Sequence, residues 1–177
     1  LMCPFNALGT AMLSYCGQNY GSNDKERVKK GVKQAFVIAF FIYIIFAGIG
    51  LLLTINGFYL YIFYSADKVN SEAIHYGNIY LYCDLSLYYI LGMLFILRNS
   101  LQGIGKALFP FLAGIGELVA RTVLCLTLPA LINHGPITIN ASSNSLLGLA
   151  FADPLAWAAA VSIMIYGAVK YIFKEND

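Results

Sequence analysis

Two ionisable residues lie one helical turn apart inside a long apolar segment. Glu117 and Arg121 are four positions apart, so in a helix they share a face and can form an ion pair. Charged side chains at membrane depth are costly and are therefore functional candidates. Two roles are open to this pair. It fastens its helix to the neighbouring helices, which is the default, or it takes a direct part in transport or gating.

A third ionisable residue, Asp84, ends the tyrosine-rich run Tyr80-Leu81-Tyr82-Cys83-Asp84. A carboxylate that faces a polar vestibule in the membrane binds a cation or a proton. A carboxylate at the end of a helix also serves as a cap or meets interfacial water, and this is the default for Asp84. The sequence places no basic residue near Asp84, so the group that would neutralise it is not identified.

The sequence lacks the residue sets that enzymes and metal sites need. The four cysteines form no C-x-x-C pair and lie in or beside apolar stretches, where a free cysteine behaves as a small hydrophobe. His75 and His134 lie far from other ligand types. No nucleophile–base set is present. We therefore expect no enzyme, no metal site and no cofactor apart from a coupling ion.

Composition indicates a membrane protein. Of the 177 residues, 59% are hydrophobic and 11% are charged, whereas a typical soluble domain is about 45–50% apolar and about 25% charged. A soluble fold of this length could not bury so much apolar surface. The sequence predicts an all-α membrane protein, a polytopic bundle of transmembrane helices.

Five apolar segments predict the spans. Asn56-Gly57 is expected to end the second span, and Asp153-Pro154 is expected to cap and start the fifth. The chain opens at Leu1 inside an apolar run, so the first span is expected to be partial and the chain a fragment. The predicted spans are about residues 1–16 (partial), 35–55, 80–97, 107–132 and 154–173.

The basic residues predict the orientation in the membrane. If the spans alternate, nine of the eleven Lys and Arg residues lie on one side, in segments 22–34 and 98–106 and in the C-terminal tail, and Lys68 alone lies on the other. Positive charge marks the cytoplasmic side. The C-terminus is therefore predicted to be cytoplasmic in a multi-pass protein of the cell membrane.

The first basic loop contains a glycine-flanked polar turn, residues 17–22. No GKS or GKT follows it and no strand precedes it, so a phosphate-binding loop is not expected. Nucleic-acid binding needs a basic face on a soluble domain, and we expect no nucleic-acid partner. Composition favours a loop whose lysines lie near anionic headgroups.

Three segments resemble multidrug and toxic compound extrusion (MATE) transporters. "GTAMLSYCGQNYGSNDKERVKKGVKQA" resembles the polar Q-N-x-G loop after the second helix of a half, with Gln18, Asn19 and Gly21 at the motif positions. "LRNSLQGIGKALFPFLAGIGELVARTVL" is similar to the next inward loop and helix, and its motif residues are Arg98, Gln102, Gly103, Gly105 and the Glu117/Arg121 pair. "GLAFADPLAWAAAVSIMIYGAVKY" resembles the last helix. The segments occur in the family's order and spacing.

The resemblance implies that residues 1–177 belong to the C-terminal lobe of a two-lobe, twelve-helix transporter. The chain would hold part of the eighth helix and then the ninth to twelfth helices. Such transporters export organic cations or drugs by alternating access, driven by inward flow of Na⁺ or H⁺. The implied partners are the lipid bilayer, the missing N-terminal part of the same transporter and small organic cations. The fragment is not expected to transport alone.

One departure from the family concerns the coupling ion. Some members carry an acidic cation ligand deep in the tenth helix, where this chain reads Tyr89-Ile90-Leu91-Gly92-Met93 and has no acid. Asp84 lies nearer the outer end, and the site used by other members is in the first lobe. The resemblance therefore assigns no coupling residue, and Asp84, Glu117 and Arg121 remain candidates.

Two other functions stay open. One is a lipid-linked sugar flippase of similar fold, whose cavity is usually richer in Arg and Lys; this chain places only Arg121 within a predicted span. The other is a membrane subunit that scaffolds a partner without transporting. Such a subunit needs no ionisable residues at membrane depth.

Overall fold

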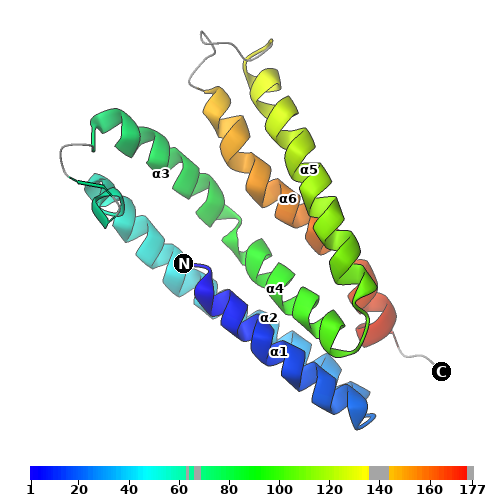
Figure 1. Cartoon of the computed structure of the whole chain (residues 1–177). Helices are drawn as coiled ribbons and strands as arrows, with labels where there is room; N and C mark the ends of the chain where they lie inside the picture. Colours follow the sequence, from blue (N-terminus) through cyan, green and yellow to red (C-terminus); the bar gives the residue numbers. More distant parts are fainter. Residues whose placement is uncertain (63, 66–68, 136–143, 175–177) are drawn as a thin grey trace.

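The chain folds into a bundle of long helices (Figure 1). The structure, a computed structural model, describes residues 1–62, 64–65, 69–135 and 144–174. No strand occurs in these residues, and the predicted all-α class is confirmed. The helices are α1 (Cys3–Gly21), α2 (Lys25–Thr54), α3 (Ser71–Ser86), α4 (Tyr88–Gly103), α5 (Leu108–Ile132) and α6 (Ser145–Ala168).

Short helical turns extend two of these helices. After α2 come two 3₁₀ turns, η1 (Ile55–Gly57) and η2 (Leu60–Ile62), and after α6 comes the π-helical turn η4 (Val169–Phe173). The break predicted at Asn56-Gly57 is confirmed, because these two residues have φ angles of 54° and 67°. Such left-handed backbone cannot continue an α-helix.

The first basic segment is mostly helix. Asp24 caps α2 by accepting a hydrogen bond from the Arg27 backbone N–H (3.0 Å), and Asn23 between the helices has a φ of 63°. The predicted polar loop 22–34 is therefore wrong in extent, since α2 begins at Lys25 and its first turns carry the basic side chains. The turn is short because a left-handed asparagine and an aspartate cap reverse the chain within a few residues.

The third apolar segment forms two helices, α3 and α4, which meet at Leu87 at an angle of 51°. The predicted single span 80–97 covers parts of both. No proline or glycine marks the break, but the Ser86 hydroxyl donates to the Cys83 carbonyl (2.7 Å), a bond of a type that bends helices. Arg98, predicted to lie in a loop, lies inside α4, and the turn that follows is centred on Gly105 with φ 77°.

The last helix starts earlier than predicted. It begins at Ser145, so the expectation that Asp153-Pro154 caps and starts this helix is wrong. Pro154 lies buried inside α6. Proline is tolerated within membrane helices when neighbouring groups satisfy the freed carbonyl. Asp153 is thereby released from capping and faces other helices.

The described residues contain three helices long and apolar enough to cross a membrane. These are α2 with η1, α5, and α6 with η4; the bent pair α3–α4 makes a fourth if it counts as one span. The predicted segment 107–132 coincides with α5 almost to the residue. Many apolar side chains of α2 and α5 are exposed, which suits contact with lipid or with another protein segment.

The helices form two layers, with α1, α2, α3 and α4 on one side and the α5–α6 hairpin on the other (Figure 1). Helix α6 joins the layers because it packs against α3, α4 and α5. Tyr88 stands at this junction, with its ring 5.5 Å from Phe5 of α1 and 6.3 Å from Trp157 of α6, measured between ring centroids. The core is aliphatic and aromatic on both sides of this contact.

Helix α1 crosses α4 at two glycines. A Cβ atom on Gly103 would lie 2.5 Å from the Leu13 carbonyl oxygen and 3.2 Å from the Gly17 nitrogen. Small residues let helix backbones approach closely in membranes. Gly103 is therefore a packing residue at the α1–α4 contact. Gly114, by contrast, has open space where its Cβ would be.

We expect Gly103→Ala to separate α1 from α4 and Gly114→Ala to leave the fold intact. Overpacking costs typically about 1–3 kcal/mol, while the helix propensity gained is similar for the two alanines. Thermal unfolding of the purified protein in detergent measures the difference. An unfolding midpoint for Gly103→Ala equal to that for Gly114→Ala would contradict the close contact.

Candidate functional site

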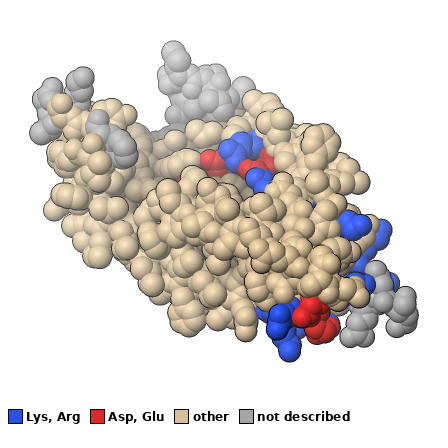
Figure 2. All heavy atoms as spheres, turned by 60° about the horizontal axis from the view of Figure 1, so that its bottom comes forward, with Lys and Arg blue, Asp and Glu red and all other residues tan. Residues whose placement is uncertain are grey.

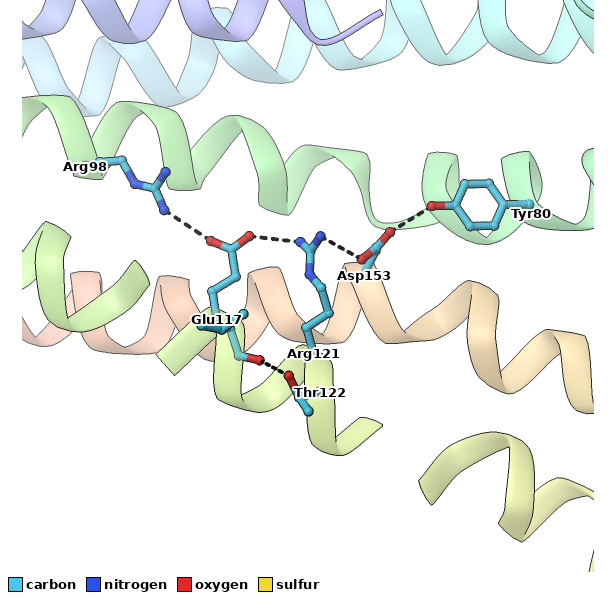
Figure 3. Close-up of polar contacts among 7 residues, drawn as sticks. Tyr80, Arg98, Glu117, Arg121, Thr122 and Asp153 are labelled. Carbon is cyan, nitrogen blue, oxygen red and sulfur yellow. Dashed lines mark hydrogen bonds and ion pairs between the residues drawn. The ribbon is translucent and has the colours of Figure 1, made fainter. Parts of the chain in front are cut away.

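A row of charged and polar side chains links α3, α4, α5 and α6 (Figure 3). Glu117 lies between two arginines, with Oε2 3.1 Å from Arg98 Nη2 and Oε1 3.0 Å from Arg121 Nη2. Arg121 continues the row, with Nη1 3.1 Å from Asp153 Oδ1. The Tyr80 hydroxyl donates to Asp153 Oδ2 at 2.7 Å. We call these five residues the charged row.

Helix geometry sets the order of the charged row. Glu117 and Arg121 are one turn apart on α5, and the predicted ion pair between them forms. Arg98 from α4 and Asp153 from α6 then reach the two ends of this pair. Whether the pair acts in transport stays a prediction.

The charges of the row balance one another. Two guanidinium groups face two carboxylates, and Arg121 uses separate nitrogens for Glu117 and Asp153. Balance matters because an unpaired charge at membrane depth is far more costly than a paired one. On the face drawn in Figure 2, acidic and basic atoms lie together within a largely uncharged surface.

The row is only partly shielded. The side chains of Glu117 and Arg121 keep 20% and 40% of their surface exposed, measured without the membrane. Partial exposure lowers the strength of each ion pair compared with a fully buried one. We infer that the row positions helices and selects partners more than it adds stability.

Asp84 lies beside the row and adds a third carboxylate. It follows Tyr80 by one turn of α3, and Asp153 and Arg121 are close enough to act on it electrostatically. Its Oδ1 is buried and accepts no hydrogen bond from the described residues. Among the described residues, no hydrogen bond shows the helix capping by the Asp84 side chain that the sequence predicted. A buried carboxylate oxygen without a donor is a place where a proton or a cation binds.

The oxygens around Asp84 suit a small hard cation. Carboxylates of Asp84 and Asp153 and the phenol of Tyr80 are hard oxygen ligands of the kind that alkali and alkaline-earth cations prefer. No group of three or more metal-ligating His, Cys, Asp or Glu side chains is found in the described part of the chain.

The polar motif of the first turn shapes the backbone. Asn19 donates from Nδ2 to the Tyr15 carbonyl (2.7 Å), and its own carbonyl accepts from the Ser22 hydroxyl (3.0 Å) and the Asp24 N–H (2.9 Å). Gln18 is exposed and Gly21 leaves open space around it. These residues build the α1–α2 turn, at the end of the molecule where α4 also ends (Figure 1).

The second motif has a mixed role. Gly103 is a packing residue and Gly105 a turn residue, whereas Arg98 belongs to the charged row. Gln102 is exposed and lines, with Arg98, an open groove of about 520 Å³ along α5. The groove is otherwise mainly apolar.

The sequence does not identify two members of the row, Tyr80 and Asp153, as site residues. It predicts Asp153 as a helix cap and Tyr80 as one of several tyrosines. Arg98 is identified as a motif residue, but of a basic loop and not of a helix. A signal was present for Asp153: a carboxylate within a long apolar segment needs a partner, and Arg121 was the basic residue predicted at similar depth.

We expect Glu117→Gln to destabilise the protein, because it leaves two guanidinium groups facing one carboxylate. The loss should be about 1–2 kcal/mol, less than for a fully buried pair. Thermal unfolding in detergent and membrane abundance measure it. The control is Glu72→Gln, which removes an exposed carboxylate of α3.

The double variant Arg98→Gln/Glu117→Gln provides the second arm. Removing Arg98 relieves part of the charge imbalance, so the two losses should not add. Strict additivity, or a Glu117→Gln protein as stable as Glu72→Gln, would contradict the shared role of Glu117.

Comparison with known proteins gives one match. Residues 1–127 match the family model described as MatE. The matched part contains α1 to α4 and most of α5, and so includes Asp84, Arg98, Glu117 and Arg121. The searches of curated proteins and of solved structures found no match.

Proposed function

Because the chain belongs to the MatE family of membrane transporters, we propose that it is part of a cation-coupled antiporter that exports organic cations or drugs. In this proposal residues 1–177 lie in the C-terminal lobe of a two-lobe, twelve-helix protein that works by alternating access. Inward flow of Na⁺ or H⁺ drives export. The observation that carries the proposal is the buried Asp84 Oδ1, which accepts no hydrogen bond from the described residues, beside a balanced charged row.

Cation binding at Asp84 would change the charge of this region by one unit. Without a cation, the Asp84 carboxylate competes with Asp153 for Arg121 and repels Asp153. With Na⁺ or H⁺ bound, this competition ends and Arg121 is left to Glu117 and Asp153. A ligand shifts a conformational equilibrium only through such differential contacts.

The change in charge at Asp84 can alter the packing of the helices that carry the row. Asp84 lies at the end of α3, just before the bend at Leu87, and Asp153 lies on α6, which packs against α3, α4 and α5. Altering the Tyr80–Asp153–Arg121 contacts would therefore move α3 relative to α6 about that bend. We propose this motion as the local step that couples cation binding to the rocking of the lobe.

The orientation belongs to the same proposal. The α1–α2 turn, the α4–α5 turn and the C-terminal end of α6 lie at one end of the bundle (Figure 1), and they carry most of the basic residues. We propose that this end is cytoplasmic in the cell membrane, as positive charge favours.

The flippase alternative gains one observation, because Arg98 lies inside α4, which forms with α3 the bent pair that can count as one span. A flippase cavity needs positive charge that is open to an anionic substrate. Here both guanidinium groups are paired with carboxylates. The antiporter therefore remains the better account. A scaffold subunit has no need for a charged row.

Expression of the full-length gene in an efflux-deficient host tests the proposal. Accumulation of a cationic dye is measured with an imposed Na⁺ gradient, with an imposed H⁺ gradient and with neither. We expect one gradient to lower accumulation. Dye levels that match the empty-vector host under both gradients would overturn the antiporter.

We expect Asp84→Asn to lower gradient-driven efflux by roughly tenfold or more, because the amide cannot carry the charge that binds the cation. Membrane abundance should stay near that of the unmodified protein, since no described residue forms an ion pair with Asp84 and the substitution therefore breaks none. Initial rates of dye efflux in vesicles, normalised to abundance, measure the effect.

The matched control is Glu72→Gln, an exposed carboxylate on the same helix. It should transport at the unmodified rate. Full efflux by Asp84→Asn would show that Asp84 is not part of the coupling site. The antiporter proposal itself would still be tested by the dye experiment.

A further inference from the structure

A pocket of about 240 Å³ lies at the basic end of the bundle, and no residue of the charged row lines it. It forms where α1, α2, the α4–α5 turn and η4 meet. Basic atoms gather at this end of the molecule in Figure 2. Its lining includes four lysines and two tyrosines, Lys25, Lys29, Lys106, Lys174, Tyr20 and Tyr171.

The described residues of the lining carry more positive than negative charge. Among them Glu26 is the one carboxylate, and it pairs with Lys29 at 3.7 Å. No carboxylate of the described residues lies within ion-pair distance of Lys25, Lys106 or Lys174. Like charges brought together in a pocket repel one another, so an anion that enters relieves this repulsion.

Tyr171 orders the basic groups around the pocket. The Lys106 ammonium lies 4.8 Å from the centroid of the Tyr171 ring, and the Lys170 ammonium lies 5.2 Å from it. Cation–π contacts of this kind hold a flexible lysine in one region. Lys106 lies in the α4–α5 turn and Lys170 lies in η4. An anion bound by lysines of separate elements would therefore connect those elements.

We propose that this pocket binds the phosphate group of an anionic lipid headgroup. Basic pockets between membrane helices at the cytoplasmic side bind anionic headgroups, and the proposal rests on the cytoplasmic orientation of this end proposed above. The helices next to the pocket carry exposed apolar side chains, which favours a lipid over free phosphate. Leu108 and Val169, each two residues from a lining residue (Lys106 and Tyr171), are 62% and 51% exposed, and Tyr166 is 64% exposed. These side chains would contact the acyl chains.

Binding would join three separate elements of the bundle. Lys25 begins α2, Lys106 lies in the α4–α5 turn, and Lys174 follows η4. A phosphate held by all three fixes the two layers of the bundle relative to each other at this end. This role is independent of the coupling ion and of the transported substrate.

Binding to the full-length protein, purified in detergent and stripped of lipid, tests the proposal. Native mass spectrometry compares phosphatidylglycerol, phosphatidylcholine and inorganic phosphate as probes. We expect phosphatidylglycerol to bind, phosphatidylcholine to bind at least tenfold more weakly, and millimolar inorganic phosphate to leave phosphatidylglycerol in place.

The variant Lys25→Gln/Lys106→Gln should weaken phosphatidylglycerol binding by roughly tenfold or more, because each lysine near an anionic headgroup adds to the electrostatic attraction between protein and lipid. The control Lys30→Gln/Lys33→Gln removes the same charge from exposed positions of α2 outside the pocket and should change binding less than about twofold. Lys106→Arg, which keeps the charge, should retain binding. If the double variant unfolds, Lys106→Gln alone is compared with Lys30→Gln.

Three results would overturn the proposal. Equal losses in the pocket and control variants would show general attraction to a basic end. Equal binding of the two lipids would exclude recognition of the anionic headgroup. Displacement of phosphatidylglycerol by inorganic phosphate would assign the pocket to free phosphate.

Discussion

The Arg121 side chain is the contact on which the arrangement of the helices at membrane depth depends. One nitrogen binds Glu117 on its own helix, and the other binds Asp153 on α6. Because a lone guanidinium in a bilayer is very costly, α5 and α6 must place carboxylates on both sides of it. The pairing of α5 with α6 follows from this requirement. The packing of this hairpin on α3 and α4, which supply Tyr80 and Arg98, follows from it as well.

Packing and charge have separate places in the bundle. The α1–α4 contact includes close-packed glycines and the Phe5–Tyr88 ring pair, and the α4–α6 contact includes the Tyr88–Trp157 ring pair, so these surfaces are mainly apolar and carry no ion pair among the described residues. The charged row lies where α5 and α6 face α3 and α4 (Figure 3). A rigid apolar part beside a polar part with alternative partners is a suitable basis for a two-state movement.

The charged row and the pocket at the basic end differ in the sign of their charge imbalance. The row together with Asp84 has one carboxylate more than it has arginines, whereas the pocket at the basic end has an excess of lysines. An excess of negative charge attracts a small cation, and an excess of positive charge attracts a phosphate. Both imbalances come from side chains that separate helices bring together.

The sequence by itself determined the all-α membrane class, the extent of α5, the break at Asn56-Gly57 and the Glu117–Arg121 pair. All of these depend on local hydrophobicity, left-handed backbone or helical spacing, which a stretch of chain specifies alone. Only the tertiary structure decided that Asp153 lies inside α6, that Arg98 reaches Glu117 and that the third segment bends at Leu87. The reason is physical: a charge at membrane depth takes its position from partners on other helices, and those partners are known only once the helices are packed.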